Sequence, residues 1–251
     1  MSRRAPALTL VLAGLGLASA LSYSALSQAP ASAAAATRSS ESQAARARKA
    51  KPTSAPRENA AFTALPALDV YFVNTRKSEQ LRLYDAFGQV DEKAARRLDA
   101  LLGDTHDRKN YTTTQLDRRT LQLLFRAAYH FRSQKVEVVS AYRKPGRRRQ
   151  GYHGTGQAID FRLDGVPAAK LAAYLRTLPR VGVGIYTHPR TQFVHLDSRS
   201  RSFHWMDGSP PGRNWRERSL GGKKLAAQDA IYTRSLDWPE GVTPPQVPFD
   251  P

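Results

Sequence analysis

Between about residues 65 and 209, apolar residues recur with two different periods. Alternating apolar residues with β-branched or aromatic side chains predict strands over residues 67–73, 79–85, 136–140, 158–163, 181–186 and 193–197. A helical period predicts one helix capped by Asp91, a second that opens at Thr114 or Asp117, and a short one over 166–178. These elements predict an α+β fold, in which helices pack on one side of a small, mostly antiparallel sheet.

The two ends of the chain lack such periods. Residues 1–33 combine an arginine pair, an apolar run and a small-residue cleavage pattern, which is typical of an export signal, with an uncleaved N-terminal membrane anchor as the alternative. Residues 34–65 are rich in Ala, Ser, Arg, Lys and Pro and predict a flexible basic linker. The folded domain is predicted over 66–209, and 210–251 as an extended tail. Signal and anchor both predict a periplasmic or secreted protein.

The charge of the chain is strongly positive, with 39 Lys and Arg against 21 Asp and Glu and a formal net charge of +18. It favours an anionic partner, such as an anionic cell-envelope surface, or it is simply a solvated surface. Nucleic acid is not expected, because the export signal and the absence of an aromatic–basic binding motif argue against it. The chain has no cysteine, so any metal must be held by His, Asp or Glu.

Two segments carry the residues with the clearest chemistry. His153 and Asp160 are separated by small residues, so the loop can fold back and bring an imidazole and a carboxylate together. His195 lies on a strand that can pair beside the strand of Asp160, and Asp197 shares its face. Two histidines and a carboxylate, with a fourth position left to water, form a catalytic zinc arrangement. Zinc in such a site brings the pKa of its water to about 7 and polarises a carbonyl group.

Each of these residues also has a structural alternative. His153 could be a loop histidine bonded to the backbone, and His195 a satisfied core histidine. Asp160 could cap a turn or a strand end, although an acid between two apolar residues needs a partner when it is buried. Of the other histidines, His106, His130 and His188 are not predicted as ligands, and His204 is a reserve candidate.

Four motifs follow one another along the chain: Ser140-x-Tyr-Arg143, His153-x-x-Gly-x-Ala-Ile-Asp160, Gly182-Val-Gly-x-Tyr186 and Phe193-Val-His-x-Asp197. Their order resembles the peptidase M15 group, and within it the exported DUF882 (YcbK-like) branch, which is similar to D-Ala-D-Ala carboxypeptidases and murein endopeptidases. The resemblance runs from about residue 81 to residue 205. It implies a compact fold around a four-stranded antiparallel sheet, zinc held by His153, Asp160 and His195, and peptidoglycan as the substrate.

The resemblance also implies roles for neighbouring residues. Arg143 matches the family arginine upstream of the first ligand, and would bind the substrate carboxylate or the developing oxyanion, unless it is one more surface arginine. Many M15 enzymes carry a glutamate base three residues before the final histidine, where this chain has Gln192, which cannot take a proton. Asp197 is therefore predicted as the base, or as the residue that orients His195. The basic insert 144–149 would line the mouth of the site and attract anionic groups.

These patterns together predict an exported, monomeric zinc metallopeptidase that acts on the peptide stems or cross-links of peptidoglycan. Its type would be a D,D- or L,D-carboxypeptidase or endopeptidase. The alternative is a non-catalytic, metal-containing module that binds the cell wall, with Gln192 marking the loss of the base. Hydrolysis of purified cell walls separates the two hypotheses.

Overall fold

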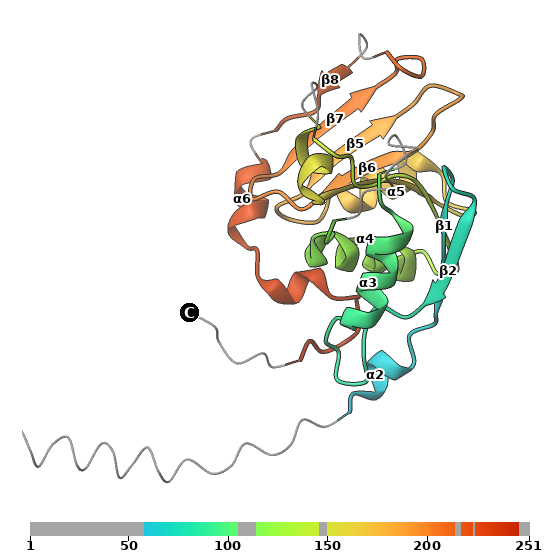
Figure 1. Cartoon of the computed structure of the whole chain (residues 1–251). Helices are drawn as coiled ribbons and strands as arrows, with labels where there is room; N and C mark the ends of the chain where they lie inside the picture. The colour runs from blue at the N-terminus through green and yellow to red at the C-terminus, as the bar shows by residue number, and fades with distance from the viewer. Residues whose placement is uncertain (1–57, 105–113, 146–149, 214–216, 223, 246–251) are drawn as a thin grey trace, which may run out of the picture. The chain divides into compact units, whose positions relative to one another are not determined.

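The computed structural model describes residues 58–104, 114–145, 150–213, 217–222 and 224–245 (Figure 1). The predicted export signal, most of the predicted linker, His106 and part of the basic insert therefore lie outside the described residues. Among the described residues, no helix combines the length and the apolar character that a membrane span needs.

The described residues form helices and strands that are mixed along the chain, with four strands in succession after α5. The α-helices are α2 (Ala60–Thr63), α3 (Glu92–Leu101), α4 (Arg118–His130), α5 (Ala168–Leu175) and α6 (Lys224–Ala230), and the 3-10 helices are η1 (Gly151–Thr155) and η2 (Arg234–Asp237). The strands are β1 (Leu68–Phe72), β2 (Lys77–Leu81), β3 (Lys135–Ser140), β4 (Ala158–Leu163), β5 (Gly182–Tyr186), β6 (Val194–Asp197), β7 (Phe203–Asp207) and β8 (Glu217–Ser219). They form one sheet in the order β2-β1-β3-β4-β6-β5-β7-β8.

Polar capping residues begin the two helices that lie between β2 and β3, as the sequence predicts. Asp91 accepts a hydrogen bond of 2.8 Å from the backbone N–H of Lys93 at the start of α3. Of the two predicted starts of α4, Asp117 is the cap, and it accepts a hydrogen bond of 2.9 Å from the backbone N–H of Thr120. Both bonds satisfy donors that the first helical turn would otherwise leave unpaired.

The α+β class is confirmed, but the prediction of a small sheet is wrong, because the sheet has eight strands and not the four that the resemblance implies. The sheet is mixed: five of its pairings are antiparallel, as the sequence mostly predicts, and two are parallel. β1 pairs with β3, and β5 with β7, in parallel. Parallel neighbours need a crossover, which β2, α3 and α4 supply for the first pair and β6 for the second. The sequence analysis does not predict β7, nor does it predict β8, which is three exposed residues without an apolar pattern. It also placed the second strand at 79–85, whereas β2 ends at Leu81.

The sheet has one face covered by helices and one polar face. Ile159 and Phe161 of β4, together with Val194 and Leu196 of β6, belong to the hydrophobic core that α4 and α5 complete. Burying such a side chain is worth ~1.5–3 kcal/mol, so this face stabilises the sheet. Because successive side chains of a strand alternate, the residues between them, which include Asp160, project from the opposite, polar face.

The segment for which the sequence predicts an extended tail, 210–251, contains β8, α6 and η2. Trp238 is 8% exposed and donates a hydrogen bond of 2.9 Å from Nε1 to the carbonyl oxygen of Gly88. Asp237 accepts a hydrogen bond of 2.9 Å from Nε of Arg119 in α4. Together with the hydrogen bond from Asn59 to the carbonyl oxygen of Thr243, these contacts attach the segment to the folded domain through η2 and beyond it.

Candidate metal centre

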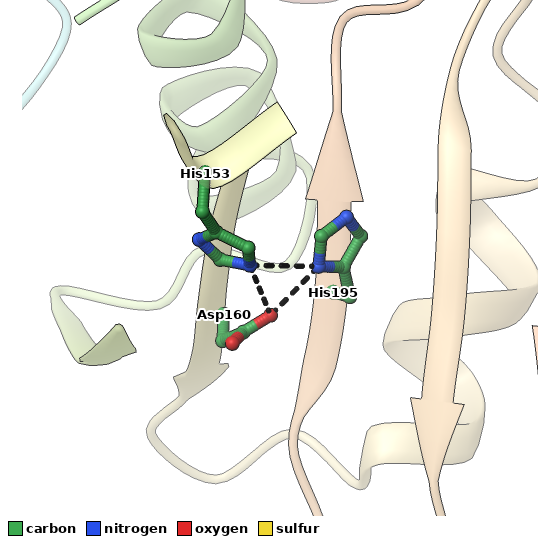
Figure 2. Close-up of side chains that lie close together, drawn as sticks. All are labelled: His153, Asp160 and His195. Carbon is green, nitrogen blue, oxygen red and sulfur yellow. Dashed lines mark hydrogen bonds and ion pairs between the residues drawn. The ribbon is translucent and has the colours of Figure 1, made fainter. Parts of the chain in front are cut away.

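The three predicted ligands come from three elements and meet on the polar face (Figure 2). Asp160 of β4 is paired directly with His195 of β6, so their side chains stand next to each other. His153 lies in η1, just before β4. The chain turns from η1 into β4 at Gly156, which has a left-handed φ of 73° and leaves no room for a Cβ beside the carbonyl oxygen of Gln115.

The ligand atoms of this cluster lie at distances that suit one bound ion. Nδ1 of His195 is 2.8 Å from Oδ1 of Asp160, Nε2 of His153 is 3.4 Å from the same oxygen, and the two nitrogens are 3.2 Å apart. Ligand atoms about 2.0–2.1 Å from one tetrahedral zinc ion lie about 3.4 Å from one another. The exposed fractions of His153, Asp160 and His195 are 5%, 3% and 7%, so the cluster is buried. The residues present therefore fit a metal ion.

The hydrogen bonds on the outer side of the cluster fix which ring atoms face inward. Nδ1 of His153 lies 2.6 Å from the carbonyl oxygen of Ala141, which can only accept, so the ring donates there and Nε2 carries the inward lone pair. Nε2 of His195 donates in the same way to Asp197 over 3.0 Å, which turns Nδ1 inward. Two imidazole lone pairs and a carboxylate oxygen thus converge on one point, and this arrangement requires a positive charge between them.

The pKa values of the cluster reflect this need for positive charge. Burial by itself lowers the pKa of His195, but its hydrogen bonds to Asp160 and Asp197 outweigh burial and raise that pKa to about 9. Burial by itself raises the pKa of Asp160, but its interactions with His153 and His195 outweigh burial and hold this pKa well below the usual range. In the absence of a metal, a proton on His195 therefore supplies the charge that a cation would supply.

Asp197 lies on the outer side of the His195 ring, away from the cluster. It is 0% exposed, and it also accepts hydrogen bonds of 2.7 and 2.5 Å from Nε and Nη2 of Arg199. Burial would raise the pKa of Asp197, but the bonds from Arg199 and His195 outweigh it and lower this pKa to about 2. Of the two predicted roles, this geometry favours orientation of His195, because a base must reach the inner side of the cluster.

Arg143 approaches the cluster from the other side. Its Nη2 donates a hydrogen bond of 2.8 Å to Oδ2 of Asp160, and its Nε donates one of 2.8 Å to Oγ of Ser140. The side chain of Arg143 is still 33% exposed, so part of the guanidinium group faces solvent. Arg143 therefore occupies one oxygen of Asp160, leaves the other for the metal, and keeps donors available for a ligand.

Glycines in β5 make room for the side chains around the cluster. A Cβ on Gly182 would overlap the carboxylate of Asp197, and a Cβ on Gly184 would overlap the ring of Trp205. The sequence pattern predicts this close approach at the two glycines. The ring centroid of Trp205 lies 4.9 Å from that of His195, so the indole forms a wall beside the cluster.

An open cleft of about 300 Å³ leads to the cluster. Its lining includes His153, His195, Arg143 and Arg199 together with Tyr186, Phe203, Trp205 and Glu217. Gln192, at the position where many M15 enzymes carry their base, lines a different cavity of about 520 Å³ beside Arg162. The sequence analysis missed Arg199 and Glu217. Arg199 could have been found, because it follows His195 and Asp197 at the next alternate position and so continues the same face. No sequence pattern points to Glu217.

The remaining histidines within the described ranges are not part of the cluster. His130 pairs with Glu240 over 2.9 Å, and His188 accepts a hydrogen bond from the backbone N–H of Arg190. His204, the reserve candidate, is buried on β7, and its Nε2 has no hydrogen-bond partner among the described residues. Among the described residues, His153, Asp160 and His195 are the one group of three His, Asp or Glu side chains whose ligand atoms lie close enough to share a metal ion.

Comparison of the amino-acid sequence with known proteins identifies a family. The family profile described as "Peptidoglycan L,D-endopeptidase MepK" (Peptidase_M15_2) matches residues 61–205, which is more than half of the chain. The chain is 35% identical over 105 residues to the probable peptidoglycan L,D-endopeptidase MepK of Haemophilus influenzae, covering 33% of this chain and 55% of the relative. It is 26% identical over 145 residues to the peptidoglycan L,D-endopeptidase MepK of Escherichia coli K12, covering 53% and 76%. No solved structure matches the chain.

The chain thus spans about half the length of the first relative and about three quarters of the second. The profile match contains all three residues of the cluster and ends at Trp205, before β8 begins. The match and the four sequence motifs agree: the chain belongs to the peptidase M15 group, in its MepK (YcbK-like) murein endopeptidase branch.

Proposed function

We propose that this chain is an exported, zinc-dependent peptidase that hydrolyses a peptide bond in the stems or cross-links of peptidoglycan. The observation that carries the proposal is the convergence of two imidazole lone pairs and a carboxylate oxygen beside an open cleft. The family and the names of the relatives support peptidoglycan as the substrate and an L,D-bond as the bond cleaved.

His153, Asp160 and His195 are the residues that would hold the ion. Two imidazoles and one carboxylate are a donor set that suits zinc (Zn2+) better than magnesium or calcium, which prefer oxygen ligands. Three protein ligands also leave a position open, as in catalytic zinc sites. When bound, such an ion polarises a carbonyl group and supplies a water-derived nucleophile near neutral pH.

Arg143 is proposed to bind the substrate. Its bonds to Asp160 and Ser140 fix the guanidinium group, and its exposed part can donate charge-assisted hydrogen bonds to a substrate carboxylate or to a carbonyl oxygen that gains charge. Because the group is already held in place, little side-chain entropy is lost when the substrate binds.

Asp197 is proposed to orient His195 instead of taking a proton from water. All its hydrogen bonds run to His195 and Arg199, on the outer side of the ring. A carboxylate with a pKa of about 2 is also a weak base near neutral pH. Asp197 thus keeps Nδ1 of His195 directed at the metal position.

A non-catalytic wall-binding module is the second candidate. The observation that favours it is that neither Gln192 nor Asp197 offers a carboxylate to the inner side of the cluster. In both cases the proposed domain order is the same: an export signal (1–33), a basic linker (34–65) beside an anionic envelope surface, and a domain that starts at about residue 66. Both candidates are proposed as monomers outside the cytoplasm, without a nucleic-acid partner.

The test combines metal analysis of the purified protein with mass spectrometry of purified cell-wall sacculi after digestion. We expect about one zinc ion per chain and released peptides with a cleaved L,D-bond. His153→Ala should lose both, whereas His188→Ala, which removes a histidine away from the cluster, should keep both. A zinc-loaded protein that releases nothing but still sediments with sacculi after chelation would show the wall-binding module instead.

A further inference from the structure

The polar face of the sheet continues beyond the metal cluster to the edge strand β8. Gly184 of β5 pairs with His195, and Tyr186, two residues further on, therefore lies on the same face. Tyr186 pairs with Asp207 of β7, and Asp207 pairs with Glu217 of β8. Because paired residues of neighbouring strands share a face, Glu217 projects from the face that carries His195.

Among the described residues that line the cleft of the cluster, Glu217 is the one carboxylate that is exposed. The other acids near the site already have partners: Asp160 is bonded to Arg143 and Asp197 to Arg199. Asp207, beside Glu217, is buried and accepts a hydrogen bond from the backbone N–H of Ser209. No described residue forms a hydrogen bond or an ion pair with the side chain of Glu217. The cleft therefore has arginines and the metal position at one end and, at the edge-strand end, a negative charge that no described residue pairs with.

Aromatic side chains form the wall between these two ends. Tyr186, Phe203 and Trp205 all line the cleft. Trp205 leans over Gly184 towards His195, and Tyr186 stacks on Phe193 with ring centroids 4.3 Å apart. The combination of a free carboxylate with aromatic rings is the chemistry that binds an ammonium group, through charge-assisted hydrogen bonds and cation–π attraction.

We propose that Glu217 is a specificity-determining residue, which binds a free ammonium group of the peptide substrate at the edge-strand end of the cleft. This inference rests on the proposed peptidase function and names one feature of its substrate: a primary amine on the part of the peptide that extends away from the metal. Glu217 lies beyond the family match, which ends at Trp205, so this preference belongs to the C-terminal part of this chain.

The experiment compares cross-linked muropeptides with the same muropeptides after acetylation of their free amines. The full, zinc-loaded chain is assayed on both, beside Glu217→Gln and the control Glu58→Gln, an exposed glutamate that does not line the cleft. For the wild type and the control, we expect acetylation to lower kcat/KM about tenfold, through KM, as fits one charged hydrogen bond. Glu217→Gln should show this loss on the free amine and no further loss on the acetylated substrate.

Two results would overturn the proposal: a wild type that treats both substrates alike, or a Glu217→Gln variant that loses kcat equally on both. If the wild type cleaves neither substrate, the proposed function fails, and the inference is then tested by calorimetric binding of the same two uncleaved muropeptides. About tenfold tighter binding of the free amine, lost in Glu217→Gln, supports an ammonium site. Equal binding refutes it. Equal melting temperatures of the three proteins establish that folding is not the cause.

Discussion

The substitution Asp197→Asn separates an orienting residue from a catalytic base. It keeps the shape of the side chain and removes the charge that His195 and Arg199 both contact. Loss of a carboxylate behind a metal-binding histidine typically weakens metal binding or activity by about 10–100-fold, or about 1.4–2.7 kcal/mol. We therefore expect the zinc affinity to fall by this factor, while kcat at saturating zinc stays within about threefold of the wild type.

The assay is a zinc titration against a competing chelator, followed by cleavage rates at saturating zinc. Loss of the ion pair with Arg199 should also lower the free energy of unfolding, by about 3 kcal/mol for a largely buried pair. Asp237→Asn is the matched control, because Asp237 is equally buried and pairs with Arg119 away from the cluster. It should lose stability and keep its zinc affinity.

A normal zinc affinity together with a large loss of kcat in Asp197→Asn would show that Asp197 is the base. If Asp197 were the base, Asp197→Asn would bind zinc normally and lose about 10²–10⁴-fold in kcat at saturating zinc. The acid limb of the pH profile of kcat would then disappear as well. Such a result would require the carboxylate to leave Arg199 and reach the inner side of the His195 ring.

Three further predictions concern stability. Gly184→Ala should destabilise the fold by ~1–3 kcal/mol in thermal unfolding, because its Cβ overlaps Trp205, whereas Gly222→Ala, with open space around it, should have little effect. Burial lowers the pKa of His204 to about 4, so between about pH 6.5 and pH 4 the unfolded chain binds the proton more readily, and stability should fall as the pH decreases through this window. His204→Leu should flatten that part of the pH–stability curve, and an equally steep curve would contradict the assignment. Zinc at about 100 times its dissociation constant should stabilise the wild type by about 2.7 kcal/mol and leave the melting temperature of His153→Ala unchanged.

The cluster itself could be predicted from the sequence, because local pattern and chemistry agree there. The strand predicted over 158–163 has the bounds of β4, so the alternation that buries Ile159 and Phe161 also determines the face of Asp160. The small residues before it allowed the prediction that His153 folds back. The pairing of Asp160 with His195 needed only that two neighbouring strands be antiparallel.

The features that could not be predicted from the sequence depend on contacts between distant segments. The two parallel pairings join segments whose apolar patterns do not reveal their neighbours, so the extent of the sheet was underestimated. The residues around Glu217 show no pattern that would point to the cleft, because Glu217 reaches it only through the pairing of β8 with β7. The role of Asp197 depends on such a contact as well: the alternation predicts its face, but the position of Arg199 decides on which side of the His195 ring its carboxylate lies.

The two arginine–aspartate pairs on either side of the cluster explain how the site keeps its acids charged. Arg143 offsets the charge of Asp160, and Arg199 offsets that of Asp197, so the four groups together are formally neutral. A bound divalent cation would add two positive charges at one end of the cleft, where few counter-charges remain. A substrate carbonyl or carboxylate is then favoured beside the metal, and Glu217 is the cleft residue that can favour a positive group at the opposite end. The cleft would thus be positive at the metal end and negative at Glu217, so a peptide that carries a carboxylate and an ammonium group would bind in one direction. Acetylation removes the positive charge of the ammonium group, and it should therefore weaken binding at the Glu217 end.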